Sequence, residues 1–326
     1  MHGLPFYSQN GLLERVPAEV RAKLPSLDFL GRRCPGARVC FRTNATEFTV
    51  KLELETLSPD VGMSIFACQA INVLIGDRPT ARFAGLVNPP DYNTKAAQKT
   101  FYKNNEIEDV TLFLPRNEII ANVELNFPDD AAVESPTPYN YDPILFYGSS
   151  ITEGGCCCRM TNVYNAIISN RLNVDYYNYG FSGSAKGEPE MAELIASIPM
   201  SIFVYDYDHN APSAEHLAAT HEPFFRIIRA AHPNLPVIIL TKPDFDYSPD
   251  NAKRRDIIRA TWEHALAEGD NNVYFIDGQS LFGDTDRHAC TCDCCHPNDL
   301  GFYRMAETVE PVVANVLAKL YKSEEL

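Results

Sequence analysis

The sequence predicts an α/β protein in which a three-layer, doubly wound sheet of about five parallel strands follows an antiparallel β-sandwich of jelly-roll type. Two observations predict this division. Short runs of alternating apolar and polar residues lie between residues 38 and 127, whereas apolar strands alternate with helical segments from residue 143 onward. A polar, proline-rich stretch at 128–142 separates the two patterns and is the expected linker. The expected domains are 1–138 and 139–326.

The first half contains four runs in which every second residue is apolar, as in a strand with one buried face. These runs are 38–43, 48–54, 110–114 and 123–127. Turn-rich pieces at 57–60 and 88–91 separate them. Short alternating strands without a long helix are typical of a β-sandwich or jelly roll.

The second half alternates strands with helical segments. The expected strands are 144–147, 174–179, 201–207, 237–241 and 273–277, and the expected helices are 162–172, 189–197, 213–231, 251–268 and 299–321. Strands that are apolar on both faces need helices on both sides, which predicts a parallel sheet as the middle of three layers. The active site of such a domain lies beyond the carboxyl ends of its strands.

The composition limits the classes of function. The 326 residues carry a formal net charge of −15 and show no basic patch, so a nucleic-acid partner is not expected. No apolar run reaches the roughly 18–20 residues of a membrane span, and the first residues do not resemble a secretory signal. We therefore expect a cytoplasmic protein without a membrane partner, and a homo-oligomer is compatible with the sequence.

A candidate nucleophile follows the first strand of the second half. An apolar run leads into Ser149 and Ser150, and a serine at the sharp exit of a strand is where an α/β enzyme can expose a nucleophile. Asp293 and His296 lie three residues apart near the end of the chain. A histidine can act as the base for such a serine, and an aspartate can orient the histidine. The residue types therefore indicate nucleophilic catalysis.

Four short blocks contain these residues and two further candidates. They are Gly148-Ser149-Ser150-Ile151-Thr152, Asn178-Tyr179-Gly180-Phe181-Ser182-Gly183, Asp206-Tyr207-Asp208-His209-Asn210 and Asp293-Cys294-Cys295-His296-Pro297-Asn298-Asp299-Leu300-Gly301. Their order resembles that of the SGNH (GDSL-type) hydrolase superfamily, which is named after a Ser, a Gly, an Asn and a His in four blocks. The resemblance covers about 143–326 and implies a flavodoxin-like sheet. With a β domain in front, the chain resembles the branch that includes deacetylases of plant polysaccharides and some acyl-transfer enzymes.

The resemblance implies a role for each matching residue. Ser150 matches the nucleophile, His296 matches its base, and Asp293 matches the residue that orients the base. The backbone N–H groups of Ser150 and Gly183 and the side-chain amide of Asn210 match the oxyanion hole. Fixed donors of this kind are needed because negative charge develops on the carbonyl oxygen when the serine attacks. A reaction through Ser150 and His296 needs no metal ion and no organic cofactor, so none is expected.

Two positions depart from the family pattern. The first block has Ser149 where an Asp is usual. This departure affects the surroundings of the nucleophile and not the assignment of Ser150 itself. The third block has Asp208 and His209 before Asn210, where a Gly usually precedes the Asn. The role of Asn210 therefore depends more on the structure than those of Ser150 and His296 do.

These residues predict a serine esterase that removes O-acetyl groups from carbohydrate through an acyl-enzyme. The carbohydrate substrate, an oligosaccharide derived from plant glycan, is what the resemblance implies. One alternative is an acyltransferase that uses the same site and passes the acyl group to an alcohol. The other is a non-catalytic glycan-binding or metal-binding protein, although such a protein has no need of a complete Ser, His and Asp set.

Seven of the ten cysteines flank the predicted active site. They are Cys156, Cys157 and Cys158 after the nucleophile, and Cys290, Cys292, Cys294 and Cys295 around the aspartate. Three interpretations remain open: free thiols in a reducing compartment, one or two disulfides that join the two clusters, and a thiolate zinc site. The zinc interpretation fits least well, because the spacing departs from the usual pairs of cysteines two to four residues apart.

Overall fold

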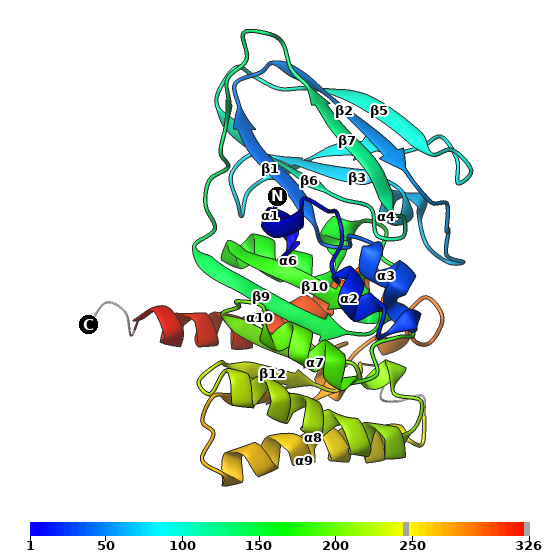
Figure 1. Ribbon diagram of the computed structural model, residues 1–326, viewed down its shortest axis with the longest axis vertical. Coiled ribbons are helices and arrows are strands. Elements are labelled where there is room, and N and C mark those ends of the chain that lie inside the picture. The colour runs from blue at the N-terminus through cyan, green and yellow to red at the C-terminus, as the bar shows by residue number, and fades with distance from the viewer. Residues whose placement is uncertain (244–247, 323–326) are drawn as a thin grey trace.

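The computed structural model describes residues 1–243 and 248–322 and shows two regions stacked along the long axis of the molecule (Figure 1). The first region contains two antiparallel sheets, and the second contains a parallel sheet of five strands. The predicted fold class is therefore confirmed. Among the described residues, no helix is both long and apolar enough to cross a membrane.

The first region is a pair of sheets packed face to face. Its strands are β1 (Arg38–Thr43), β2 (Glu47–Leu54), β3 (Ile71–Ile75), β4 (Arg82–Val87), β5 (Ala96–Tyr102), β6 (Glu108–Phe113), β7 (Ile120–Asn126) and β8 (Val133–Glu134). One sheet has the order β4-β3-β6-β1-β8, and the other has the order β5-β2-β7. Apolar side chains from both sheets, such as Phe41, Phe48 and Leu112, form one buried core between them. The jelly-roll connectivity stays a prediction.

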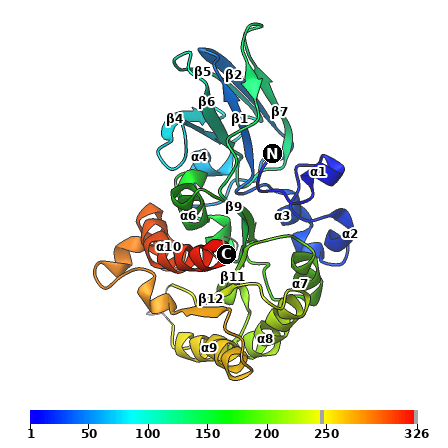
Figure 2. The same cartoon turned by 90° about the vertical axis from the view of Figure 1, so that its left-hand side faces the viewer.

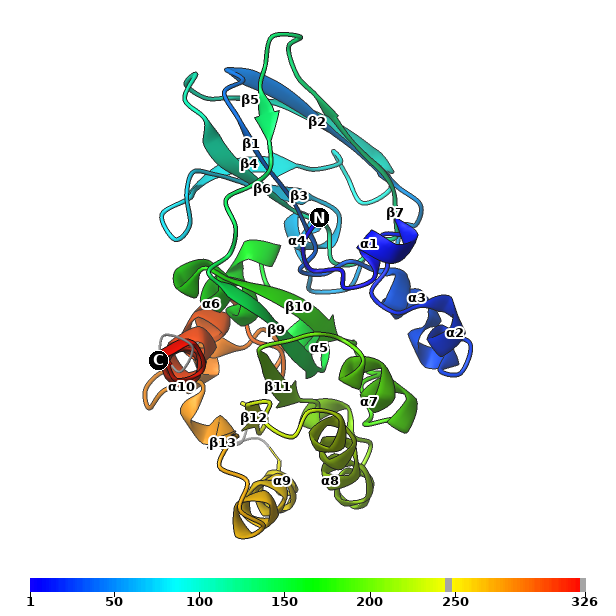
Figure 3. The same ribbon diagram turned by 60° about the vertical axis from the view of Figure 1, so that its left-hand side comes forward.

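Short helices precede and interrupt these strands. They are α1 (Tyr7–Asn10), α2 (Ala18–Arg21), the 3-10 turn η1 (Pro25–Leu27), α3 (Asp28–Arg32) and α4 (Ile65–Cys68). Val16, Leu24 and Leu27 are buried in a core that belongs mainly to the second region. There α2 lies beside the helix α7 (Pro189–Ala196) (Figures 2 and 3). The N-terminal segment thus packs against the parallel-sheet region.

The second region has the expected parallel sheet. Its strands are β9 (Tyr141–Gly148), β10 (Val174–Gly180), β11 (Ile202–Asp206), β12 (Val237–Leu240) and β13 (Val273–Ile276), in the order β10-β9-β11-β12-β13. This is the flavodoxin-like order, in which the chain reverses direction of winding beside the first strand. The topological switch point therefore lies between β9 and β11.

Helices cover both faces of the parallel sheet. They are α5 (Ser150–Glu153), η2 (Met160–Asn162), α6 (Tyr164–Leu172), α7, η3 (Asp208–Asn210), α8 (Ala214–Ala231), α9 (Asn251–Ala267), η5 (Gly278–Ser280), η6 (Arg287–Cys290) and α10 (Asp299–Lys322). Ile144 and Phe146 of β9 pack in the core with α6 and α10, whereas Leu145 and Tyr147 pack in the core with α7 and α8. Alternate residues of a strand point to opposite faces, so both faces of the sheet present apolar side chains to helices. Figure 2 shows the resulting three layers.

The sequence missed β3, β4, β5 and β8. The run at β5 is mostly exposed, and its residues show no apolar alternation. The strand β4 contains Gly85 in a left-handed conformation at a register shift, and β8 has only two residues. The strands and helices predicted after residue 143 differ from the observed bounds by a few residues at most. The buried strands of the parallel sheet therefore carry the clearest sequence signal, whereas β3 was missed although it is buried inside its sheet.

Candidate active site

The turn after β9 presents Ser150 at the start of α5. Ser149 caps this helix, because its hydroxyl accepts a hydrogen bond of 3.1 Å from the N–H of Ile151. The turn is tight: a Cβ on Gly148 would lie 2.2 Å from the carbonyl oxygen of Asp206 and 2.2 Å from Oγ1 of Thr152. Only glycine fits there, and this close packing fixes the position at which the serine leaves the sheet.

The predicted serine, histidine and aspartate form one hydrogen-bonded chain. Oγ of Ser150 lies 2.8 Å from Nε2 of His296. Nδ1 of His296 lies 2.7 Å from Oδ2 of Asp293, and the backbone N–H of His296 donates to Oδ1 of the same carboxylate at 2.7 Å. Both oxygens of Asp293 thus hold the histidine, one through its ring and one through its backbone. The imidazole is oriented with its other nitrogen on the serine hydroxyl, as a general base requires.

The carboxylate of Asp293 stays ionised beside this histidine. Partial burial raises the pKa of Asp293, but hydrogen bonds from the ring and the backbone of His296 outweigh burial and lower the pKa overall. About half of the Asp293 side chain is exposed (49%), compared with 28% for His296. A charged carboxylate stabilises the imidazolium that forms when the histidine takes the serine proton.

The two other predicted oxyanion donors come from the loops after β10 and β11. Gly183 has φ +67°, and its α-carbon faces open space, so a side chain there would strain the backbone without any steric clash. One N–H of the Asn210 amide donates to the carbonyl oxygen of Phe181 at 2.7 Å. This bond ties the loop after β11 to the loop after β10. An amide has two N–H donors, so the second can serve an oxyanion.

One cavity of about 410 Å³ brings the predicted residues together. Ser150, Gly183, Asn210, Asp293 and His296 all line it. A larger cavity of about 680 Å³, between the N-terminal segment and β7, contains none of them. We place the candidate active site in the smaller cavity, because a nucleophile, a base and candidate donors converge there. The assigned roles of these residues remain predictions.

Sequence reasoning missed a buried carboxylate three residues after the serine. Glu153 is fully buried, and Oε1 accepts a hydrogen bond of 2.6 Å from Arg33 and lies 3.5 Å from a nitrogen of Arg15. Oε2 accepts from Arg116 at 2.8 Å and from the hydroxyl of Ser182 at 2.6 Å. Three guanidinium groups thus surround one carboxylate. All three come from the first 133 residues, whereas Glu153 and Ser182 belong to the parallel-sheet region.

This cluster holds the loop that carries Gly183. The backbone N–H of Ser182 also donates to Oε2 of Glu153 at 3.2 Å, and Arg116 donates to the hydroxyl of Ser182 at 2.7 Å. Burial raises the pKa of Glu153, but the charges of Arg116, Arg33 and Arg15 outweigh burial and lower it to about 2. The carboxylate is therefore charged at neutral pH and accepts two hydrogen bonds from Ser182, while Arg116 donates a third to the same residue. It positions the residue next to a predicted oxyanion donor.

Only part of this cluster carried a sequence signal. Glu153 directly follows the nucleophile block, so an acidic residue so close to the predicted nucleophile could have been flagged. The arginines at 15, 33 and 116 lie in no motif, and their side chains meet only in the folded chain. Asp60, which pairs with Arg116 at 2.9 Å and lines the cavity, was missed for the same reason.

A second buried carboxyl lies behind the serine. Asp206 ends β11; its backbone oxygen accepts from the N–H of Ser149 at 3.2 Å, and its side chain accepts from the hydroxyl of Thr152 at 3.3 Å. Burial raises the pKa of Asp206 to about 8, with a smaller opposing effect from His209. Asp206 is therefore mostly protonated at neutral pH and acts as a neutral support for the turn.

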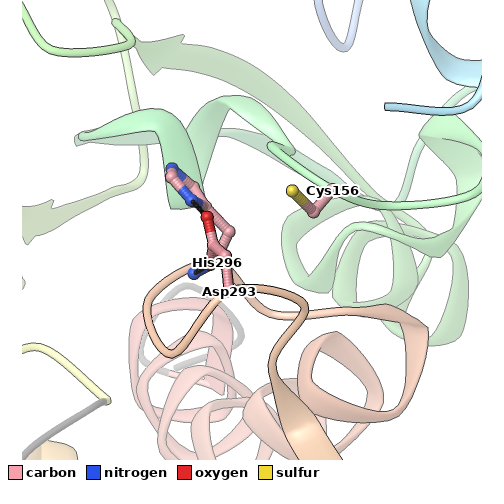
Figure 4. A group of neighbouring side chains, drawn as sticks. All are labelled: Cys156, Asp293 and His296. Atoms are coloured by element: carbon pink, nitrogen blue, oxygen red, sulfur yellow. Dashed lines mark hydrogen bonds and ion pairs between the residues drawn. The ribbon is translucent and has the colours of Figure 1, made fainter. Parts of the chain in front are cut away.

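All ten cysteines are free thiols in the structure. Cys156 is half-buried and lines the cavity, as does Cys295, whose sulfur lies 3.6 Å from Nδ1 of His209. The thiol of Cys292 lies 3.9 Å from the backbone oxygen of Cys156. Figure 4 shows Cys156 facing Asp293 and His296 from the opposite loop. Cys156 of the first cysteine cluster and Cys292 and Cys295 of the second therefore lie at or beside the candidate active site.

Comparison with known families agrees with this geometry. A model of the GDSL-like lipase/acylhydrolase family matches residues 141–314, which is more than half of the chain. The chain belongs to this family. A second model, of the N-terminus of SGNH-hydrolase-type esterases, matches residues 1–133. No curated protein sequence matches the chain. The two models together match the parallel-sheet region and the β region in front of it, as the resemblance stated from the sequence implies.

Solved structures share its fold over nearly the whole length. A protein from Bacteroides ovatus, named as a GDSL-like lipase, has 24% identity and a TM-score of 0.87, with 97% of this chain and 95% of that chain covered. SsfX3, a salicylyl-acyltransferase of a tetracycline biosynthetic pathway, has 19% identity and a TM-score of 0.77, with 93% and 89% covered. A family two carbohydrate esterase from Clostridium thermocellum, solved with cellohexaose, has 15% identity and a TM-score of 0.64, with 87% and 93% covered.

Proposed function

We propose that this GDSL-like acylhydrolase is a serine esterase that removes O-acetyl groups from carbohydrate. The observation that carries the proposal is the hydrogen-bonded chain from Ser150 through His296 to Asp293, inside a cavity with candidate oxyanion donors. In the reaction, His296 takes the proton of Ser150 as the serine attacks the ester carbonyl. The sugar alcohol leaves with that proton, and water then releases acetate from the acyl-enzyme in a second step of the same kind.

The oxyanion forms between the loops after β9, β10 and β11. The N–H of Ser150 lies in the first turn of α5, where N–H groups have no partner within the helix. The N–H of Gly183 and the second N–H of Asn210 complete the set of donors. Because these groups are fixed before the reaction, they stabilise the developing charge without reorganisation, and each such donor contributes about 100- to 1000-fold to kcat.

The polar walls of the cavity support a sugar ester with a short acyl group. Asp60, Arg116, Ser182 and His209 line the cavity together with the catalytic residues. The carboxylate of Asp60 is half exposed (50%), so it can accept hydrogen bonds from sugar hydroxyls while Arg116 fixes its position. A long alkyl chain would displace water from these polar and charged groups without offering hydrogen bonds in return, which costs free energy. The solved relative with bound cellohexaose also supports an oligosaccharide substrate, here one derived from plant glycan.

The test is hydrolysis by the wild type and by Ser150→Ala. We expect turnover of 4-nitrophenyl acetate to exceed that of the butyrate and octanoate esters, and acetate to be released from acetylated oligosaccharides, as measured by mass spectrometry. Ser150→Ala should abolish both activities. Turnover that remains unchanged in Ser150→Ala would show that the nucleophile is wrongly assigned. Activity on long acyl esters alone would contradict the carbohydrate substrate.

The second candidate function is an acyltransferase that uses the same residues. The fold shared with the acyltransferase SsfX3 supports considering it. Water and an alcohol compete for the same acyl-enzyme, so the products distinguish the two activities. Acetate formation that is unaffected by an added acceptor alcohol supports the esterase. Transfer of most of the acetyl groups to the alcohol would support the acyltransferase. A protein that binds oligosaccharide without any turnover would be a non-catalytic glycan-binding protein.

A further inference from the structure

One group of potential metal ligands in the described residues includes part of the catalytic machinery. The sulfur of Cys156, a carboxylate oxygen of Asp293 and a ring nitrogen of His296 all lie within 4.8 Å of one another. Figure 4 shows the three side chains converging from two loops, with Cys156 on one and the other two on the second. A thiolate, a carboxylate and an imidazole are three of the groups that bind Zn²⁺ in proteins.

The distances suit a zinc ion after small side-chain rotations. Zinc binds sulfur at about 2.3 Å and nitrogen or oxygen at about 2.0–2.2 Å, so neighbouring ligand atoms of a tetrahedral site lie about 3.3–3.8 Å apart. An atom pair at the 4.8 Å limit must approach by about 1.0–1.5 Å, and the 2.7 Å hydrogen bond between the ring of His296 and Asp293 must open. Cys156 and His296 are half-buried and Asp293 is half exposed, so an ion can reach them from solvent. The thiol of Cys292 lies 3.9 Å from the backbone oxygen of Cys156 but is not one of the three grouped ligands.

We propose that Cys156, Asp293 and His296 form an inhibitory site for a thiophilic divalent cation such as Zn²⁺. Binding replaces the thiol proton, which leaves to solvent, and forms bonds from the ion to sulfur, oxygen and nitrogen. These bonds engage the carboxylate and the imidazole that the serine reaction needs. The ion therefore blocks the base, and a chelator restores it. This site uses one cysteine with two catalytic residues, so the spacing of the cysteines among themselves does not limit it.

The first experiment measures zinc binding directly, by isothermal titration calorimetry of the full chain kept reduced with a phosphine that carries no thiol. We expect one strong zinc site in the wild type. In Cys156→Ser the affinity should fall by at least about tenfold, because a serine hydroxyl is a poor zinc ligand. The matched control is Cys158→Ser, which changes an exposed thiol outside the group and should bind zinc as the wild type does.

A spectroscopic measurement identifies the ligand. Cobalt(II) bound to a cysteine thiolate gives a charge-transfer absorption band, which should be present in the wild type and in Cys158→Ser and absent in Cys156→Ser. His296→Ala should also lose strong binding. Circular dichroism confirms that each variant is folded. Wild-type affinity in Cys156→Ser, or loss of binding in Cys158→Ser, would overturn the proposal.

The inhibition is measured separately from the binding. Zinc at saturation should lower wild-type hydrolysis of 4-nitrophenyl acetate by at least about tenfold, and a chelator should restore it. Each variant is compared with its own zinc-free rate, so any direct effect of the substitution cancels. Ser150→Ala protein should still bind zinc, because Ser150 is not among the ligands. Zinc binding thus tests this site even if the proposed esterase activity fails. Binding without inhibition would overturn the inhibitory role.

Discussion

The two sides of the active-site cavity are built in different ways. On the side of the parallel sheet, Ser150, Gly183 and Asn210 follow the ends of neighbouring strands, and the backbone places them. On the side of the first region, Arg116 reaches the buried Glu153, and these two side chains hold Ser182 in the loop that also carries Gly183. The side of the parallel sheet is specified by local motifs, whereas the side of the first region forms only when the two regions fold against each other. The comparison shows that the family motif contains the reacting groups but only part of their support.

The largest effect should come from the side with the motif. Ser150→Ala removes the nucleophile, so kcat should fall by more than about 1000-fold while the fold is kept. Steady-state kinetics on 4-nitrophenyl acetate and thermal unfolding check this. A fall of less than about tenfold would show that another group attacks the ester. The parallel-sheet side of the cavity would then not supply the nucleophile.

A smaller effect is expected from Asn210→Ala. The variant removes an oxyanion donor and its bond to the carbonyl of Phe181, so kcat should fall by about 100- to 1000-fold with little change in KM. Asn210→Asp is the matched variant of similar shape. It keeps the size but adds negative charge beside the oxyanion, so it should be at least as impaired. Equal activity of wild type and Asn210→Ala would remove Asn210 from the oxyanion hole.

The supporting cluster is tested by Glu153→Gln. This change leaves three buried guanidinium groups around a neutral amide, so the free energy of unfolding should fall by about 3–5 kcal/mol. Because Ser182 loses its charged acceptor, kcat should also fall by about tenfold. Urea unfolding and kinetics measure the two effects. A destabilised variant with full kcat would show that the cluster supports the fold alone.

Two arginines of the cluster give a matched pair. Arg116 contacts both Glu153 and Ser182, whereas Arg33 contacts Glu153 without reaching Ser182. Both Arg116→Lys and Arg33→Lys should lower the unfolding temperature, because lysine cannot reproduce the planar set of donors. Only Arg116→Lys should lower kcat as well, by a few-fold. An equal loss of kcat in both variants would argue against a specific path through Ser182.

The last prediction concerns stability alone, and it tests the protonated Asp206 next to the nucleophile turn. An unfolded Asp has a pKa of about 3.9, and the folded pKa of Asp206 is about 8. Between these values only the folded state holds the proton, so this contribution to stability is complete below about pH 4 and is lost as the pH rises through 8. Asp206→Asn does not titrate, and its unfolding temperature relative to the wild type should rise from pH 4 to pH 8. A difference that stays constant with pH would contradict this.

The sequence alone determined the fold class of both regions and the three residues of the hydrogen-bonded chain. It could do so because buried parallel strands are apolar over their whole length and because Ser150, Asp293 and His296 lie in compact blocks. Only the tertiary structure decided the rest. The arginines around Glu153 come from distant parts of the chain, and a buried ion pair has no periodicity that a sequence shows. The same holds for Cys156, whose thiol meets Asp293 and His296 only because two loops at one edge of the sheet face each other.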